Sequence, residues 1–203
     1  MTGAVTARRP LLPSVDRRQV LRYAGVREGD AMTEALLDAC LAELDGAISP
    51  RICFAEVPVV REGDLLDLGF ARVGSAALSA HLAACDRAVV LAATVGVGID
   101  RLIARYGALS PARALLFQAI GTERVETLCD LLCNELAAAA RSEGCLLTSR
   151  FSPGYRDLPL TLQREIFTLL EPSRRIGLSL NASLLMSPSK SVTAIVGITK
   201  NDH

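Results

Sequence analysis

The sequence predicts an α+β fold in which helices pack around a twisted, largely antiparallel β-sheet. Two observations lead to this prediction. Helix-forming segments dominate the middle of the chain, whereas β-rich segments cluster toward its ends. The chain shows neither an internal repeat nor the regular alternation of strands and helices that would indicate a parallel α/β sheet.

Length and composition indicate one globular domain. The chain has 203 residues, half of them apolar, and its 22 basic and 22 acidic residues balance. This composition argues against disorder and gives no broad cationic surface for nucleic acid. We expect residues 1–13 to form a flexible N-terminal arm and residues 14–203 to form a single domain. The sequence has no signal-peptide pattern and no apolar run of membrane length, so we expect a soluble, cytoplasmic protein.

The N-terminal part is predicted to contain two helices and a strand. Asp16 is a suitable cap for a short helix over residues 17–23. In residues 33–44 the apolar side chains recur on one side of a helix. Residues 52–60 are β-rich, and because Pro58 cannot donate to a strand ladder, we expect an edge strand there.

The middle of the chain is predicted to be mainly helical. Gly107 is expected to end one helix, and Ser110 followed by Pro111 is a suitable start for the next. The expected elements are, in order, a helix over 75–85, a buried strand over 87–94, a helix over 99–106 and the longest helix of the fold over 112–141.

The C-terminal part is predicted to return to strands. A helix there should stop at Pro172, and the alternating residues 176–180 are typical of a strand. The expected elements are a short strand over 146–149, the helix over 160–170, the strand over 176–180 and a last strand over 191–198.

Gly96-Val-Gly98 lies between a predicted strand and a predicted helix, where a nucleotide-binding turn has to be considered. The motif lacks the third glycine and the acidic residue of a dinucleotide site. We therefore interpret it as a tight connection, with the dinucleotide site as the alternative.

Cysteine and histidine give no strong sign of a metal or catalytic site. The six cysteines form no Cys-x-x-Cys pair and are expected to be reduced thiols. Cys129 and Cys133 share one side of a helix and offer two metal ligands, but without a third ligand we interpret them as buried apolar residues. His81 is expected to be a packed or surface residue, and His203 is terminal.

The most informative segment is the loop 150–160, Arg-Phe-Ser-Pro-Gly-Tyr-Arg-Asp-Leu-Pro-Leu. The guanidinium of Arg150 matches a carboxylate through two parallel hydrogen bonds. Pro153 and Gly154 suit the central positions of a type II turn, and Tyr155 offers its ring to a flat group or to a cation. One small ligand would use all of these groups: an amino acid joined to a nucleoside through a positively charged sulfur.

Two motifs carry a resemblance to a known family. They are Arg150-x-Ser-Pro-Gly-Tyr-x-Asp-x-Pro-Leu running into Gln163-x-x-Ile-Phe-x-Leu-Leu, and Ile176-Gly-Leu-Ser-Leu-Asn-x-Ser-Leu-Leu-Met-x-Pro-x-x-Ser-Val-Thr. Together they resemble the activation domain of cobalamin-dependent methionine synthase and its free-standing relatives. A weaker likeness at Ala93-Thr-Val-Gly and around Glu126 extends through the middle of the chain.

The resemblance implies a role in the reductive reactivation of methionine synthase, with S-adenosylmethionine as methyl donor. One electron from a flavodoxin-like or ferredoxin-like protein forms cob(I)alamin, which accepts the methyl group. The cobalt is the nucleophile and the thioether leaves without a proton, so orientation of the reactants replaces a general base. We therefore expect no catalytic residue. The Asp-x-His-x-x-Gly motif of corrinoid carriers is absent, so cobalamin is expected on a separate protein.

The same resemblance implies roles for individual residues. Arg150 would hold the ligand carboxylate and Tyr155 would line the adenosyl or sulfonium region. Glu126, with Asp130 one turn later, would face the ligand amino group, and Glu123 is the competing register. The whole predicted S-adenosylmethionine site comprises Arg150, Ser152, Pro153, Gly154, Tyr155, Glu126 and Ser191, the last from a second wall over residues 186–192.

Departures from the larger enzymes leave an alternative open. Their closing strand supplies an aromatic residue, whereas this chain has Ala194-Ile-Val, and Ala182 stands where an acid is common. The alternative is a non-catalytic assembly or docking subunit of a split methionine synthase or another corrinoid methyltransferase. A third hypothesis is a small-molecule methyltransferase that acts without a corrinoid.

Overall fold

The α+β prediction is confirmed by the computed structural model, which describes residues 2–26, 30–44 and 46–200. Its main sheet has five strands in the order β1-β2-β6-β10-β7, and every neighbouring pair is antiparallel. The strands are β1 (Thr6–Arg8), β2 (Arg51–Pro58), β6 (Cys85–Thr94), β10 (Ser191–Lys200) and β7 (Cys145–Leu147).

The central strands β6 and β10 are buried on both faces, and this explains their continuous apolar sequences. They pair over most of their length, from Ser191 opposite Thr94 to Ile198 opposite Arg87. Successive residues point to opposite faces of the sheet. Leu91, Ala93, Ala194 and Val196 belong to one hydrophobic cluster, whereas Val90, Ala92 and Ile195 belong to another.

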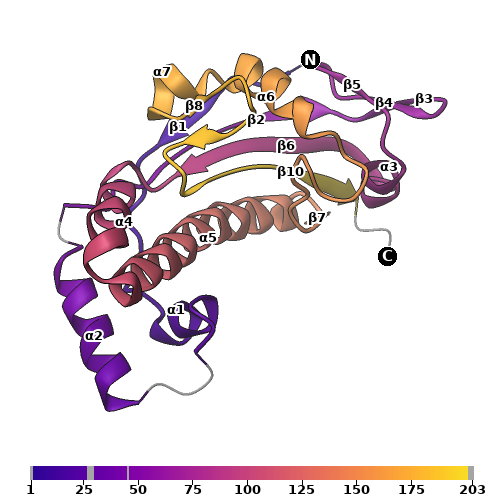
Figure 1. The fold of residues 1–203 in the computed structure, drawn as a ribbon. Coiled ribbons are helices and arrows are strands. Elements are labelled where there is room, and N and C mark those ends of the chain that lie inside the picture. Colours follow the sequence, from indigo (N-terminus) through magenta and orange to yellow (C-terminus); the bar gives the residue numbers. More distant parts are fainter. Residues whose placement is uncertain (1, 27–29, 45, 201–203) are drawn as a thin grey trace.

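Helices cover both faces of this sheet (Figure 1). The long helix α5 packs on one face, and α1, α2 and α4 pack against α5. The opposite face carries α6 and α7, which contact β2 and β6. On the first side lie α5 (Pro111–Ser142), α1 (Arg17–Tyr23), α2 (Ala31–Ala42) and α4 (Gly98–Leu109). The remaining elements are α3 (Ala76–His81), η1 (Leu160–Leu162), α6 (Gln163–Leu170), α7 (Pro172–Ile176) and the small strands β3 (Val60–Glu62), β4 (Leu65–Asp67), β5 (Arg72–Val73), β8 (Ser179–Leu180) and β9 (Met186–Ser187).

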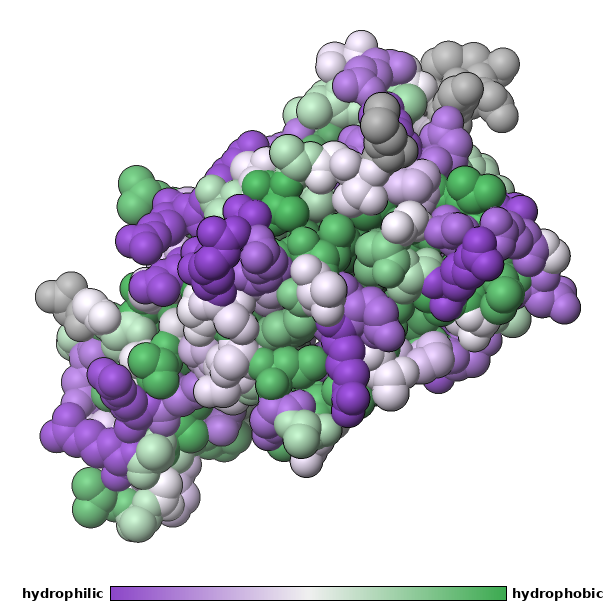
Figure 2. All heavy atoms as spheres, turned by 90° about the horizontal axis from the view of Figure 1, so that it is seen from above, coloured by the Kyte–Doolittle hydropathy of each residue, from purple (hydrophilic) through white to green (hydrophobic). Residues whose placement is uncertain are grey.

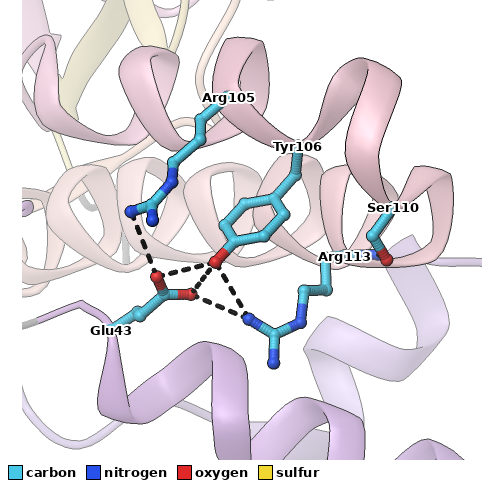
Figure 3. Close-up of polar contacts among 5 residues, drawn as sticks. All are labelled: Glu43, Arg105, Tyr106, Ser110 and Arg113. Carbon is cyan, nitrogen blue, oxygen red and sulfur yellow. Dashed lines mark hydrogen bonds and ion pairs between the residues drawn. The ribbon is translucent and has the colours of Figure 1, made fainter.

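A polar cluster attaches α2 to the α4–α5 pair (Figure 3). The Tyr106 hydroxyl lies 2.8 Å from each carboxylate oxygen of Glu43, the residue that follows α2. Arg113 belongs to the cluster, with Nη1 3.1 Å from Glu43 and its guanidinium carbon 5.1 Å from the Tyr106 ring centre. Arg105 is a more exposed member, with Nη1 3.5 Å from Glu43. The Tyr106 side chain is largely buried and stacks on Phe117.

Several predicted elements need correction. Strand β2 is not an edge strand, because Thr6–Arg8 pairs with it on the side away from β6. Pro58 is tolerated because it is the last residue of β2. Helix α4 continues through Gly107 to Leu109. Helix α6 does end before Pro172, at Leu170, and Pro172 then begins the separate helix α7, since proline suits the first turn of a helix.

The residues predicted to form an N-terminal arm include β1, so part of this segment lies in the sheet. Arg124 also holds the segment, donating to the carbonyl oxygen of Pro13 at 2.6 Å and to that of Ser14 at 3.2 Å. Within the described ranges, no helix has both the length and the apolar character needed to cross a membrane. Figure 2 shows hydrophobic residues reaching the surface between hydrophilic ones on the face seen from above.

Candidate functional site

The loop that follows β7 is held along strand β10 by Phe151. The backbone amide of Phe151 donates to the carbonyl oxygen of Ile195 at 2.8 Å, and the amide of Ile195 donates back at 2.8 Å. The Phe151 ring is buried in the core beneath α6. The loop therefore starts from a fixed point on the central sheet.

The predicted type II turn is present at Ser152–Tyr155. The amide of Tyr155 donates to the carbonyl oxygen of Ser152 at 3.1 Å, and Pro153 and Gly154 occupy the central positions. Gly154 has φ 85°, which the third residue of a type II turn requires and which a residue with a side chain adopts at a cost. The turn projects the Tyr155 ring, which is 55% exposed and meets Phe151 edge to face at 5.3 Å.

Asp157 fastens the far side of the loop to α3. Its carboxylate accepts hydrogen bonds from the Ser75 hydroxyl at 2.6 Å and from the backbone amide of Ala76 at 2.7 Å. The hydroxyl of Ser75, together with these amide donors, holds the pKa of Asp157 below its usual range. The sequence placed Asp157 in the motif without assigning it a role, because its partners are about 80 residues away.

Arg150 reaches from the loop to the long helix α5. Its Nη2 atom lies 2.7 Å from Glu126 Oε2 and 3.0 Å from Asp130 Oδ1. Its Nη1 atom is buried and has no hydrogen-bond partner among the described residues. The side chain of Arg150 is 23% exposed, which distinguishes it from a freely solvated surface arginine. The guanidinium thus contacts two carboxylates through Nη2, while the N–H groups of Nη1 remain unpaired in the part of the chain that the structure describes.

The helix register brings Glu126, not Glu123, to Arg150. Glu123 is 2% exposed and lies on the side of α5 that faces α1. Its carboxylate pairs with Arg124 and accepts from the Asp16 amide at 3.1 Å and the Thr127 hydroxyl at 3.0 Å. Glu123 is therefore part of the packing between α5 and α1, and Glu126 is the acid available to the loop.

A cleft of about 560 Å³ opens between α3 and this loop. Three rings line it, those of His81, Phe151 and Tyr155. His81 Nε2 lies 2.8 Å from the carbonyl oxygen of Ser149, and its ring packs on Phe151 at 5.0 Å. The lining residues are Ala77, Ala80, His81, Ser149, Arg150, Phe151, Ser152, Tyr155 and Arg156. The sequence did not predict that α3 contributes, because the contact joins residues 68 positions apart.

Ser191, predicted from the second wall, does not line this cleft. Its hydroxyl donates to the carbonyl oxygen of Pro188 at 2.7 Å and lies 2.9 Å from Thr94 Oγ1. The neighbouring Ser189 binds Asp100 of α4, and Lys190 Nζ lies 3.1 Å from Thr122 of α5. The start of β10 is thus tied to α4 and α5. Of the predicted site residues, Arg150, Ser152 and Tyr155 line the cleft. Pro153 and Gly154 form the turn beside it without lining it, and Glu126 contacts it only through Arg150.

Two other features of the sequence have packing explanations. A Cβ atom at Gly98 would lie 2.2 Å from the carbonyl oxygen of Ala47, so the Gly96-Val-Gly98 turn must lack a side chain there. Cys129 lies beneath Arg150, and burial raises the pKa of its thiol to about 12 although the Arg150 charge opposes this shift. Among the described residues, no three Cys, His, Asp or Glu side chains gather as a metal site.

The structure combines an antiparallel sheet that is crossed by one long helix with a cleft that is lined by three rings. Arg150 lies at this cleft and pairs with Glu126 of the long helix. No family model and no curated protein matches the chain. A similar solved structure is the MetH reactivation domain bound to AdoHcy, with a TM-score of 0.67 and 16% sequence identity. The match covers 98% of this chain and 79% of that chain. At this identity the likeness shows a shared fold.

Proposed function

We propose that this chain is a reactivation subunit for cobalamin-dependent methionine synthase, which binds S-adenosylmethionine in the Arg150 cleft and presents its methyl group to the cob(I)alamin of a separate corrinoid protein. The single observation that carries the proposal is the position of the Arg150 guanidinium, which lies between Glu126 and the aromatic cleft. The solved neighbour with AdoHcy, the demethylated form of the same ligand, supports it through the shared fold.

The residues of the cleft suit the parts of this ligand. The unpaired Nη1 donor of Arg150 would bind the ligand carboxylate once the guanidinium turns toward the cleft. Glu126 and Asp130 would then accept from the ligand ammonium group, keeping the charges of this end balanced. Phe151 and Tyr155 supply ring surface for the adenosyl group. These residues bind and orient the ligand, and none of them has to exchange a proton with it.

The proposed chemistry does not require a general base. When bound, S-adenosylmethionine supplies a methyl group on a positively charged sulfur, and the bond between carbon and sulfur breaks with its electron pair left on sulfur. The reduced cobalt of the partner would supply the electron pair of the new bond to the methyl carbon, after receiving one electron from a flavodoxin-like or ferredoxin-like donor. The protein then contributes alignment of the reactants, which supplies several orders of magnitude in rate.

The proposal is tested by label transfer. The chain is mixed with the cob(II)alamin-containing subunit of methionine synthase, a low-potential electron donor and S-adenosylmethionine labelled in its methyl group. We expect label in methylcobalamin only when all four components are present. If the donor reduces the corrinoid and no label is transferred, the proposal is wrong.

One observation favours the alternative, a non-catalytic docking subunit. Nη2 of Arg150 already contacts two carboxylates of α5, so the charge of Arg150 is balanced without a ligand. A docking subunit would bind the corrinoid partner with the same affinity in the absence and the presence of S-adenosylmethionine. Calorimetry with the partner and with the ligand separately distinguishes the two functions.

A further inference from the structure

Arg156 stands at the cleft without a role in the proposed function. It lines the cleft, and its guanidinium carbon lies 5.6 Å from the centre of the Tyr155 ring. This distance is within the range of a cation–π interaction. In the part of the chain that the structure describes, Arg156 has no ion pair, so its charge is not neutralised by a carboxylate.

The backbone fixes this arrangement. Arg156 has φ 51°, a left-handed conformation that is uncommon for a residue with a side chain. On either side, Tyr155 is held by the turn at Gly154, and Asp157 is bound to the amide groups at the start of α3. The two neighbours thus hold the backbone of Arg156 in a strained conformation at the cleft.

We infer that Arg156 is a specificity-determining residue that disfavours a positively charged sulfur in the cleft. Its charge lowers the affinity for the methyl donor, S-adenosylmethionine, relative to the affinity for the thioether product, S-adenosylhomocysteine. This inference rests on the proposed function. S-adenosylmethionine and S-adenosylhomocysteine differ by one methyl group and one positive charge. The guanidinium of Arg156 lies over the Tyr155 ring, so a sulfonium bound beside this ring would meet a like charge that a neutral thioether would not meet.

The same repulsion also affects the transfer of the methyl group. It acts on the sulfonium before the methyl group leaves, and it disappears afterwards because the product sulfur is neutral. Arg156 therefore favours departure of the methyl group as well as retention of the product. An accumulating thioether product would then compete effectively for the cleft and reduce methyl transfer.

The test is a comparison of the two ligands by calorimetry in wild type, Arg156→Gln and Arg156→Lys. We expect Arg156→Gln to raise the affinity for S-adenosylmethionine relative to S-adenosylhomocysteine by roughly two- to fivefold, the range of an exposed cation–π contact. Arg156→Lys keeps the charge and should keep the wild-type ratio. The change should shrink at high salt, because exposed charges are screened. Arg101→Gln removes an exposed charge from α4 and should leave the ratio unaltered.

The outcomes separate this inference from the proposed function. If both ligands bind and Arg156→Gln alters their affinities equally, or not at all, the inference is overturned while the proposed function stands. If neither ligand binds wild type, both are overturned. An altered ratio that does not depend on salt would assign the effect to the shape of the loop and would also overturn the inference.

Discussion

At the residue scale, the loop 150–160 combines a local turn with contacts to residues that are far away in the sequence. The turn at Pro153-Gly154 is encoded by the two residues that form it, and the structure confirms it. The role of Asp157 depends on Ser75 and Ala76, and the contact of His81 with the loop depends on where α3 packs. Pairings across such separations are decided by tertiary packing, and a single sequence gives no period or cap that reveals them.

Asp157 gives a prediction for stability against pH. Its pKa is lowered from an ordinary value of 3.8, so the ionised form stabilises the folded protein above that pH, and this contribution is lost as the pH falls through the lowered pKa. Asp157→Asn should therefore lower the urea midpoint at pH 7, and the difference from wild type should narrow below about pH 4. Asp64→Asn, at an exposed acid of the same region, is the control. A deficit of constant size from pH 7 to pH 3 would contradict the assignment.

At the scale of elements, periodicity and caps located most helices to within a few residues. The long helix was expected over 112–141 and is Pro111–Ser142, and the cap at Asp16 is present. The misplaced edge strand shows the limit of this approach. The outer partner of β2 is Thr6–Arg8, a short segment with no strand pattern of its own. It pairs there because the outer edge of β2 presents backbone N–H and C=O groups that would otherwise be unpaired.

The cluster at Tyr106 gives a prediction at this scale. Its hydroxyl donates to Glu43 and accepts from Arg113 Nη1 at 3.0 Å, so Tyr106→Phe leaves part of this network unsatisfied between α2 and α4. We expect the free energy of unfolding in urea to fall by about 1 kcal/mol. Arg105→Gln removes the most exposed member, whose side chain is 62% exposed, and should change stability much less. If the two substitutions lowered the free energy of unfolding equally, the buried Tyr106 hydroxyl would not stabilise the cluster more than the exposed Arg105 does.

At the scale of the whole molecule, the sheet brings together segments that are far apart in the sequence. Phe151 pairs with Ile195 in the middle of β10, and this pairing sets the loop between α5 and α3. One side of the loop then reaches Glu126 of α5, and the other reaches Ser75 at α3. The candidate site is therefore a product of the fold as a whole. The sequence motif predicted the residues of the loop, whereas the contribution of α3 to the cleft depends on how the chain folds.

The most direct test of the central claim, that Arg150 binds the amino acid end of S-adenosylmethionine, is calorimetric titration of wild type and Arg150→Ala with this ligand. We predict saturable binding to one site in wild type. Loss of a charged hydrogen bond should weaken binding by about 2 kcal/mol, roughly 30-fold, in the variant. Arg141→Ala, at an exposed arginine near the end of α5, controls for the loss of charge. Equal affinities for wild type and Arg150→Ala, or no binding by wild type, would contradict the claim.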